Sequence, residues 1–340
     1  MKGKLNLPKS ITIIDGSMRE GLQSEEVFVQ TETKLFLLEG LIDAGFKCME
    51  VGAFAPPAAM PQFRDTEELL KKLPRKAGFL YKCNTFNMKL IDRAVKAKKE
   101  GYGPDIINTQ FATTEELSKA FFAVTVAERW KFIEEAVKVA HDAGLVFQLS
   151  ILNPWYCPYK GEMPIEVSLQ YTDRLVKIGC DIIRPCDPYG DATPDKTYEY
   201  FSRALDKHPN PNMHTLHIHD YRGFGISSYV AAMEAGCTRF DTSLGGIGGP
   251  TAVIVGGVYA RGISKEYVAR PFRTGLVSTE DLVSMCDAMG IETGINVEKV
   301  NQLGKWMERI LDRKLYSFCI RHGRVPKGSE IVKGRENEMA

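Results

Sequence analysis

Two histidines that lie two positions apart are the clearest sign of chemistry in this sequence. His217 and His219 belong to the run LHIHD, in which apolar and β-branched residues predict a β-strand. Side chains at positions i and i+2 of a strand point to the same side, so both imidazoles could bind one ion. The H-x-H spacing alone is a weak signal, because histidines at the polar end of a strand can share it. Support must come from other strands.

The other predicted strands also end in polar side chains, which are Arg19 and Glu20 for the first, Glu50 for the second, Asn153 for the fifth, Asp187 for the sixth and Asp220 for the seventh. Two neutral imidazoles and the Glu20 carboxylate form a ligand set that suits Zn, Mn, Fe or Co, and Mg with additional water. Such a set leaves coordination positions open for a substrate, as catalytic sites do. The sequence therefore predicts a divalent metal cofactor bound by Glu20, His217 and His219.

Three further charged residues have both a structural and a catalytic interpretation. Arg19 could form a salt bridge, or its fork of donors could hold an enolate or carboxylate oxygen of a substrate. Glu50 could be the buried partner of Arg19, or a general base. Asp187 could orient a histidine through its second nitrogen, or contact the substrate. We predict that all three are catalytic.

An alternation of short apolar runs with longer helical patterns determines the expected fold. Eight runs read as strands, beginning with ITIIDG at Ile11 and ending with RFDTSL at Arg239; the others are residues 48–53, 78–84, 105–111, 146–152, 181–187 and 214–220. Helical patterns occupy 31–45, 66–73, 88–101, 125–144, 164–179, 195–208 and 225–236. This order is typical of parallel βαβ units, so we expect an α/β protein with a TIM (β/α)8 barrel. Active sites of such barrels lie at the carboxyl ends of the strands, where the residues above are placed.

The predicted barrel does not use the whole chain. We assign residues 1–278 to the catalytic barrel, 279–326 to appended C-terminal helices and 327–340 to a polar tail. Two segments rich in proline and aromatic residues, 53–65 and 153–164, are expected to be loops over the barrel mouth that shape a substrate pocket.

Composition excludes several classes of protein. The 340 residues carry 44 Lys and Arg against 43 Asp and Glu, so no bulk positive charge attracts nucleic acid or anionic lipid. No apolar run reaches the length of about 18 residues that a membrane span needs. The N-terminus shows no signal peptide, and the eight cysteines include no CxxC pair. We expect a cytoplasmic protein with reduced cysteines and a small-molecule substrate, and with neither nucleic acid nor membrane as a partner.

Several segments in order along nearly the whole chain resemble the DRE-TIM metallolyases, and among them most closely the 3-hydroxy-3-methylglutaryl-CoA lyase family (HMGL-like, or pyruvate carboxyltransferase, domain). They are SMREGLQSEE at Ser17, MEVGAFAPPAAMPQFRD at Met49, ATTEELSKAFF at Ala112, YCPYKG at Tyr156, CDPYGDATP at Cys186, LHIHDYRGFGISSYVAAMEAG at Leu216, FDTSLGGIGG at Phe240 and STEDLV at Ser278.

The resemblance implies roles for individual residues. Glu20, His217 and His219 would bind the metal, and Arg19 would polarise the carbonyl oxygen of the substrate. Glu50 and Asp187 would lie in the catalytic shell. Gln23, Asn153 and Thr242 are predicted to bind substrate, and the resemblance favours a homodimer.

Four departures from the family pattern limit what the resemblance implies. Glu20 replaces the usual aspartate ligand and still offers a carboxylate. Pro250 stands where the lyases place a catalytic cysteine, and Leu276 stands where they place an asparagine ligand. Glu26 aligns with a basic residue that contacts coenzyme A, which weakens the case for a CoA thioester.

The predicted function is a divalent-metal-dependent carbon–carbon lyase that acts on a hydroxyacyl-CoA or a related hydroxy or oxo acid. The metal would be Mg, Mn, Zn or Co. One alternative is an acyl transferase of the homocitrate or isopropylmalate synthase type, which Glu20 and the missing cysteine and asparagine favour. Another is a non-catalytic barrel that retains the metal.

Overall fold

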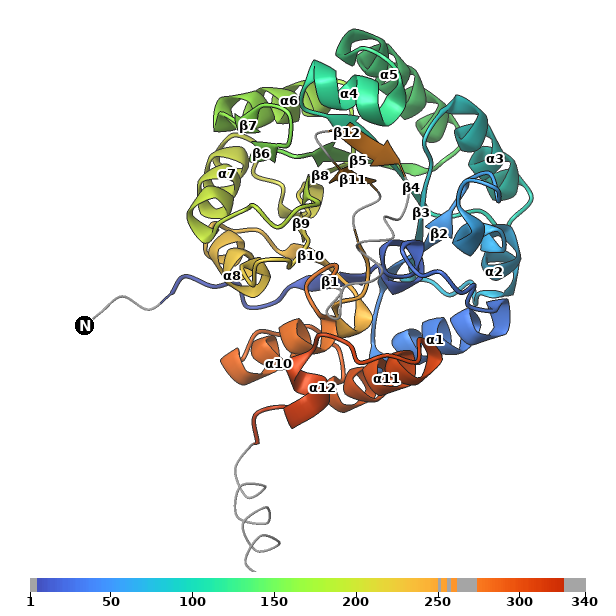
Figure 1. Cartoon of the computed structure of the whole chain (residues 1–340), viewed down its shortest axis with the longest axis vertical. Coiled ribbons are helices and arrows are strands. Elements are labelled where there is room, and N and C mark those ends of the chain that lie inside the picture. The colour runs from blue at the N-terminus through green and yellow to red at the C-terminus, as the bar shows by residue number, and fades with distance from the viewer. Residues whose placement is uncertain (1–4, 250–251, 256–257, 262–273, 327–340) are drawn as a thin grey trace, which may run out of the picture.

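A computed structural model describes residues 5–249, 252–255, 258–261 and 274–326 (Figure 1). Eight parallel strands form one sheet in the order β10-β1-β2-β3-β4-β5-β8-β9. These strands are β1 (Thr12–Asp15), β2 (Cys48–Ala53), β3 (Leu80–Asn84), β4 (Ile106–Ala112), β5 (Val146–Leu152), β8 (Ile182–Asp187), β9 (His217–Ile218) and β10 (Arg239–Thr242). The Leu216 amide donates to the Arg239 carbonyl over 3.0 Å, which joins the two end strands into a barrel. The predicted fold is confirmed.

Helices surround the strands in a ring (Figure 1). They are α1 (Thr31–Ala44), α2 (Thr66–Lys72), α3 (Met88–Lys99), α4 (Glu115–Phe122), α5 (Val126–Asp142), α6 (Ile165–Lys177), α7 (Pro194–Lys207) and α8 (Gly225–Glu234). The sequence patterns predicted all of these except α4. This helix buries only Leu117 and Ser118 completely, so it has no long apolar stripe to detect.

The seventh strand is shorter than the sequence predicts. A strand was expected over 214–220, whereas β9 contains only His217 and Ile218. Before β9, His214 and Leu216 form single parallel bridges with Ile183 and Phe240, and after it His219 forms a single antiparallel bridge with Leu276. The two catalytic candidates of this strand thus lie at the point where regular pairing ends.

The barrel interior is layered. One end is closed by an apolar cluster of Ile14, Cys48, Ile106 and Ile182, against which Val146 packs. Above it lies a layer of buried polar and charged side chains, namely Glu50, Lys82, Asn108, Gln148, Ser150, Arg184, His217 and Asp241. The larger apolar core lies outside the barrel, between strands and helices. The polar layer therefore separates the apolar plug from the mouth.

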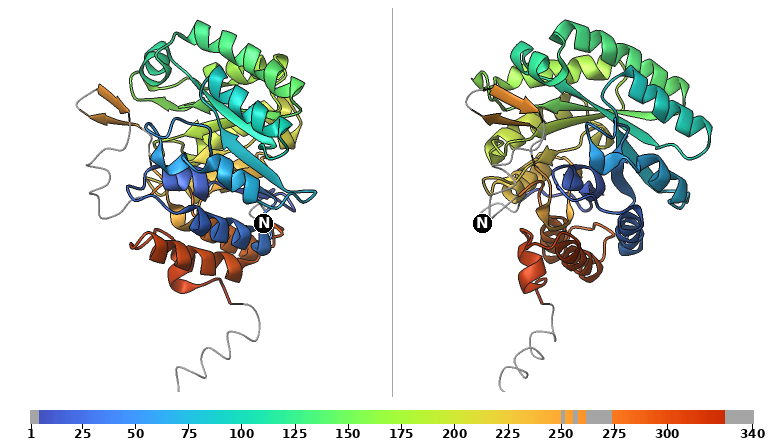
Figure 2. Two further views of the ribbon diagram at one scale, coloured as in Figure 1. Left: turned by 90° about the vertical axis from the view of Figure 1, so that its right-hand side faces the viewer. Right: turned by 45° about the vertical axis from the view of Figure 1, so that its right-hand side comes forward.

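Among the described residues, three further helices follow the barrel, α10 (Thr279–Met289), α11 (Val297–Ile310) and α12 (Phe318–His322). α11 packs beside α1, both α10 and α11 pack against the short turn η4 (Leu244–Gly246), and α12 packs on α10 and α11 (Figures 1 and 2). The patterns at 278–290 and 296–315 predicted α10 and α11, whereas α12 has only five residues and was not predicted. The predicted tail, 327–340, lies outside the described residues.

The loops at the mouth contain short regular elements. η1 (Ser17–Gly21) follows β1, η2 (Pro61–Phe63) lies in the first predicted loop, and the hairpin of β6 (Tyr156–Cys157) and β7 (Gly161–Glu162) lies in the second. A second hairpin, β11 (Ala252–Val255) with β12 (Val258–Arg261), stands away from the barrel (Figure 2). η3 (Pro211–Met213) precedes β9.

All eight cysteines are buried and form no disulfide. Within the part of the chain that the structure describes, no helix is both long enough and apolar enough to cross a membrane.

Candidate metal and active site

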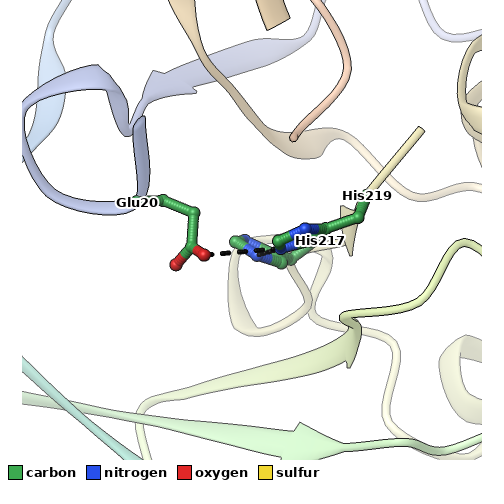
Figure 3. A group of neighbouring side chains, drawn as sticks. All are labelled: Glu20, His217 and His219. Atoms are coloured by element: carbon green, nitrogen blue, oxygen red, sulfur yellow. Dashed lines mark hydrogen bonds and ion pairs between the residues drawn. The ribbon is translucent and has the colours of Figure 1, made fainter. Parts of the chain in front are cut away.

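The side chains of Glu20, His217 and His219 converge at the mouth of the barrel (Figure 3). The two Nε2 atoms of the histidines lie 3.4 Å apart, and Glu20 Oε1 lies 3.5 Å from His219 Nε2. Bonds of about 2.1 Å to one ion, at angles near 90–110°, separate ligand atoms by roughly 3.0–3.4 Å. These two separations are thus close to those that a shared ion requires, and all three donor atoms lie within 4.8 Å of one another.

The second ring nitrogen of each histidine has its own partner. His217 Nδ1 lies 2.9 Å from Asp241 Oδ2, and His219 Nδ1 lies 3.0 Å from the Tyr221 hydroxyl. A proton held on Nδ1 of His217 by Asp241 leaves the lone pair of Nε2 directed at the ligand centre. Burial lowers the pKa of His217 to about 3 and that of His219 to about 4, so both rings are neutral at pH 7. Two neutral donors and a carboxylate fit a divalent cation.

Local hydrogen bonds fix the turn that carries Glu20. Asp15 at the end of β1 accepts from the Ser17 amide over 2.9 Å, and the Ser17 hydroxyl accepts from the Leu244 amide over 2.8 Å. Gly248 follows with a φ of 126°, and a Cβ at that position would stand 3.2 Å from the Glu20 carbonyl oxygen. Only glycine allows this conformation and this approach without strain, so the loop after β10 supports the ligand from behind.

Arg19 lies between two carboxylates. It forms an ion pair with Glu20, and its Nε lies 3.6 Å from Glu50 Oε1. Lys82 and Arg184 each approach Glu50 Oε2 to 3.3 Å. Burial raises the pKa of Glu50, but the attraction of the three cations outweighs this effect and brings that pKa to about 2. Glu50 is therefore a fixed anion that anchors Arg19.

Asp187 has different surroundings. Its carboxylate accepts from the amides of Tyr189 over 3.1 Å and Ala192 over 2.7 Å. Burial raises its pKa to about 6. No lysine or arginine of the described chain forms an ion pair with it. The histidines are oriented by Asp241 and Tyr221 instead, so the interpretation of Asp187 as the partner of a ring nitrogen finds no contact here.

Sequence reasoning missed three members of this centre, Lys82, Arg184 and Asp241. Each is at most 1% exposed and lies in the middle or near the end of a barrel strand. The available signal was a charged residue within an otherwise apolar strand, at a position whose side chain points into the barrel as those of Glu50 and His217 do. Their mutual pairing depends on register between distant strands, which the sequence does not reveal.

The three predicted substrate-binding residues have different surroundings. Both amide atoms of Gln23 and Oδ1 of Asn153 are buried without a hydrogen-bond partner among the described residues, so they could serve a ligand. Asn153 also donates to the Tyr156 carbonyl over 2.9 Å and adopts a φ of 58°. Thr242 bonds to the Thr279 hydroxyl over 2.8 Å, on the face of β10 opposite Asp241. The structure does not bring Thr242 to the ligand centre.

The departures from the family pattern can be placed in part. Leu276 is buried, forms a bridge with His219, and offers no ligand atom. Glu26 is exposed. Pro250 lies outside the described residues. Asp220, the other polar residue of the seventh strand, accepts from the Gly225 amide over 2.9 Å and begins the turn into α8.

Comparisons with known proteins point to one family. The HMGL-like family model matches residues 10–307. Hydroxymethylglutaryl-CoA lyase YngG of Bacillus subtilis is 27% identical over 310 residues, covering 91% of this chain and 96% of the relative. The human mitochondrial hydroxymethylglutaryl-CoA lyase is 28% identical, covering 92% and 89%.

Solved structures are similar as well. An HMG-CoA lyase from Acinetobacter baumannii, in complex with coenzyme A and 3-methylmalate, superposes with a TM-score of 0.81 at 28% identity, covering 94% of this chain and 98% of the other. The Bacillus subtilis HMG-CoA lyase gives 0.81 at 26% identity, covering 93% and 98%. These relatives are lyases, so the acyl transferase alternative is not favoured.

Proposed function

We propose a substrate for this chain, which belongs to the HMGL-like family and is a lyase of the hydroxymethylglutaryl-CoA lyase type. It cleaves 3-hydroxy-3-methylglutaryl-CoA or a close 3-hydroxyacyl thioester with the help of one divalent metal ion. The observation that carries the proposal is the convergence of Glu20, His217 and His219 beside Arg19 at the barrel mouth.

Glu20, His217 and His219 would hold the ion. A bound divalent ion supplies Lewis-acid polarisation of a substrate oxygen. Arg19, held by Glu50, would donate to an oxygen of the same substrate and stabilise the charge that develops there. Its planar fork is fixed from one side, so this donor is oriented before the substrate binds.

We assign the proton transfer to Asp187. Glu50 is paired with three cations, whereas the carboxylate of Asp187 accepts from two backbone amides and forms no ion pair with a lysine or arginine among the described residues. Asp187 would take the proton of the substrate hydroxyl, and the electron pair of that O–H bond would form the new carbonyl. The neighbouring carbon–carbon bond then breaks, and its electrons pass to the carbon beside the thioester carbonyl. Return of the proton from Asp187 to that carbon would give acetyl-CoA, and the other product is acetoacetate.

A basic pocket supports a thioester of coenzyme A as the substrate. Between α11 and α12 lies a cavity of about 560 Å³, lined by Lys305, Glu308, Arg309, Asp312, Arg313, Lys314, Ile320 and Arg321. Arg313 pairs with Glu25 and Arg321 pairs with Glu308. In the described part of the chain no ion pair engages Lys305 or Arg309, so both can bind phosphate. Through Arg313 this pocket contacts Glu25, which follows the turn that carries Glu20.

The test is a mass-spectrometric assay of the metal-loaded protein with 3-hydroxy-3-methylglutaryl-CoA. We expect acetoacetate and acetyl-CoA in equal amounts, and no product after treatment with a chelator. A protein that holds one metal ion per chain and forms neither product would overturn the proposed substrate. Lys305→Glu together with Arg309→Glu should raise KM for the thioester and leave metal binding unchanged.

We further propose a homodimer in the cytoplasm. The family resemblance supports the dimer, and relatives are known both as mitochondrial and as cytoplasmic lyases. Light scattering of the purified protein tests whether it is a dimer, and fractionation of the source cells tests whether it is cytoplasmic.

A further inference from the structure

Arg184 is a buried cation that contacts several members of the centre, although the sequence did not predict it as a site residue. It extends from β8 into the barrel and is 1% exposed. Its Nε donates to the Ser150 hydroxyl over 2.8 Å, and that hydroxyl donates to Asn108 Oδ1 over 2.9 Å. Gln148 donates to the same Asn108 oxygen over 3.1 Å. Side chains of β4 and β5 therefore fix one edge of the guanidinium.

The other edge of the guanidinium faces two carboxylates. Its terminal nitrogen donates to Asp241 and lies 3.3 Å from Glu50 Oε2. Asp241 is the partner of His217 Nδ1, and Glu50 is the partner of Arg19. One arginine thus bridges the carboxylate behind a metal ligand and the carboxylate behind the arginine that faces the substrate.

We propose that Arg184 is the positioning residue that holds both halves of the site, through Asp241 to His217 and through Glu50 to Arg19. This inference rests on the proposed function, because it takes His217 as a metal ligand and Arg19 as a substrate contact. Arg184 would not be a ligand of the ion: its terminal nitrogen lies 3.5 Å from His217 Nδ1, behind the ring, and it would act by fixing the direction of other side chains.

Lys82 cannot replace this function. Its Nζ lies 3.3 Å from Glu50 and 3.5 Å from Asp241, so it neutralises the same two carboxylates from another side. A lysine ammonium is a point charge on a flexible stem, whereas the arginine fork fixes direction as well as charge. Without Arg184, the Asp241 carboxylate would keep a cation nearby but lose the donor that directs it toward His217.

Positioning and simple charge predict opposite changes in metal affinity. A buried cation near the ligand centre repels a divalent ion, so if charge alone mattered, Arg184→Met would bind metal more tightly. If Arg184 positions Asp241, the same substitution should weaken metal binding by about 10–100-fold, the usual cost of losing a partner behind a ligating histidine. The sign of the change therefore decides between the two.

The experiment is a titration of metal-free protein with Mn²⁺, followed by electron paramagnetic resonance of the free ion. We compare the wild type with Arg184→Met and with Arg184→Lys, which keeps the charge and loses the fork. Both variants should bind Mn²⁺ more weakly, Arg184→Met the more so. Arg129→Met is the control, because Arg129 is also buried but contacts carbonyl oxygens and a threonine hydroxyl in place of carboxylates. It should lower the unfolding temperature and leave the Mn²⁺ affinity at the wild-type value.

Each outcome separates the two proposals. Equal or tighter Mn²⁺ binding by folded Arg184→Met and Arg184→Lys overturns the positioning function while the proposed lyase stands. A wild type that binds no Mn²⁺, Zn²⁺, Co²⁺ or Mg²⁺ overturns the proposed function instead. If Arg184→Met does not fold, Arg184→Lys and Asp241→Asn carry the test, and wild-type affinity in both would contradict the inference.

Discussion

The interior of the barrel and the layer between barrel and helices are built on opposite principles. The outer layer is apolar, with Ile133 of α5 and Phe147 and Leu149 of β5 fully buried. The interior layer holds Glu50, Arg184 and their partners at equal burial. Buried ion pairs contribute little net stability, whereas buried apolar area contributes about 25 cal/mol per Å². The outer layer therefore stabilises the fold, which leaves the interior free to arrange charge for chemistry.

The charges of the barrel interior are balanced. Arg19, Lys82 and Arg184 face Glu20, Glu50 and Asp241, so three cations meet three carboxylates. These six ionised side chains balance one another in charge without a metal ion. A bound divalent ion would add positive charge to this centre and would favour an anionic substrate.

The largest effect should follow from removing the carboxylate ligand. Glu20→Ala should abolish metal retention and reduce turnover by about 10³-fold or more, because the ion and its Lewis acidity are both lost. Metal content by mass spectrometry and the thioester cleavage assay measure the two effects. Glu39→Ala, an exposed glutamate of α1, is the matched control. Wild-type metal content in Glu20→Ala would show that the ligand assignment is wrong.

A smaller effect on turnover should follow from Asp187→Asn. If Asp187 takes the proton, kcat should fall by about 10²–10⁴-fold, the usual contribution of a general base. Metal affinity should stay the same, because Asp187 is not among the converging ligand atoms. Asp142→Asn at the exposed end of α5 should change neither quantity. A kcat within twofold of the wild type would mean that another group, and not Asp187, takes the proton.

The outer layer should respond in the reverse manner. Ile133→Ala removes a fully buried side chain and should reduce the free energy of unfolding by about 2–5 kcal/mol. Its Mn²⁺ affinity should equal that of the wild type. Urea unfolding and the metal titration give both values. A large loss of metal affinity in this variant would mean that the two regions are not energetically separate.

The smallest effect concerns Glu280, a buried carboxyl of α10 outside the barrel interior. It accepts from the Gly245 amide over 2.7 Å and from the Ser278 hydroxyl over 2.9 Å. Burial raises its pKa from 4.5 to about 8. The folded state thus binds the proton more tightly than the unfolded state, so stability should decrease as the pH rises from about 4.5 to about 8.

Glu280→Gln keeps the shape of the side chain and removes this titration. Urea unfolding of both proteins between pH 5 and about 8 should give a shallower decrease in the variant. Identical slopes would mean that Glu280 does not titrate in this range.

Much of the fold could be predicted from the sequence because its signals are local. The eight strand patterns and seven of the eight barrel helices follow from apolar periodicity within windows of about 10–20 residues. The exceptions are short elements such as α4, α12 and the β6–β7 hairpin, which bury few side chains of their own. Their positions depend on what they pack against.

The candidate site could be predicted only where its residues form a recognisable pattern within a short stretch of sequence. The spacing of His217 and His219 and the adjacent Arg19 and Glu20 are local signals. Arg184 and Asp241 are 57 residues apart, and their contact depends on strands β8 and β10 lying on either side of β9 in the closed barrel. Such partners are determined by barrel register, which no short window of sequence contains.

The central claim is that one divalent ion at Glu20, His217 and His219 is required for carbon–carbon bond cleavage. The most direct measurement adds Mn²⁺ stepwise to metal-free protein and records bound metal and 3-hydroxy-3-methylglutaryl-CoA cleavage in the same samples. The account predicts that activity rises in proportion to occupancy and saturates at one ion per chain in the wild type, with neither binding nor activity in Glu20→Ala. Full activity of the metal-free protein would contradict it.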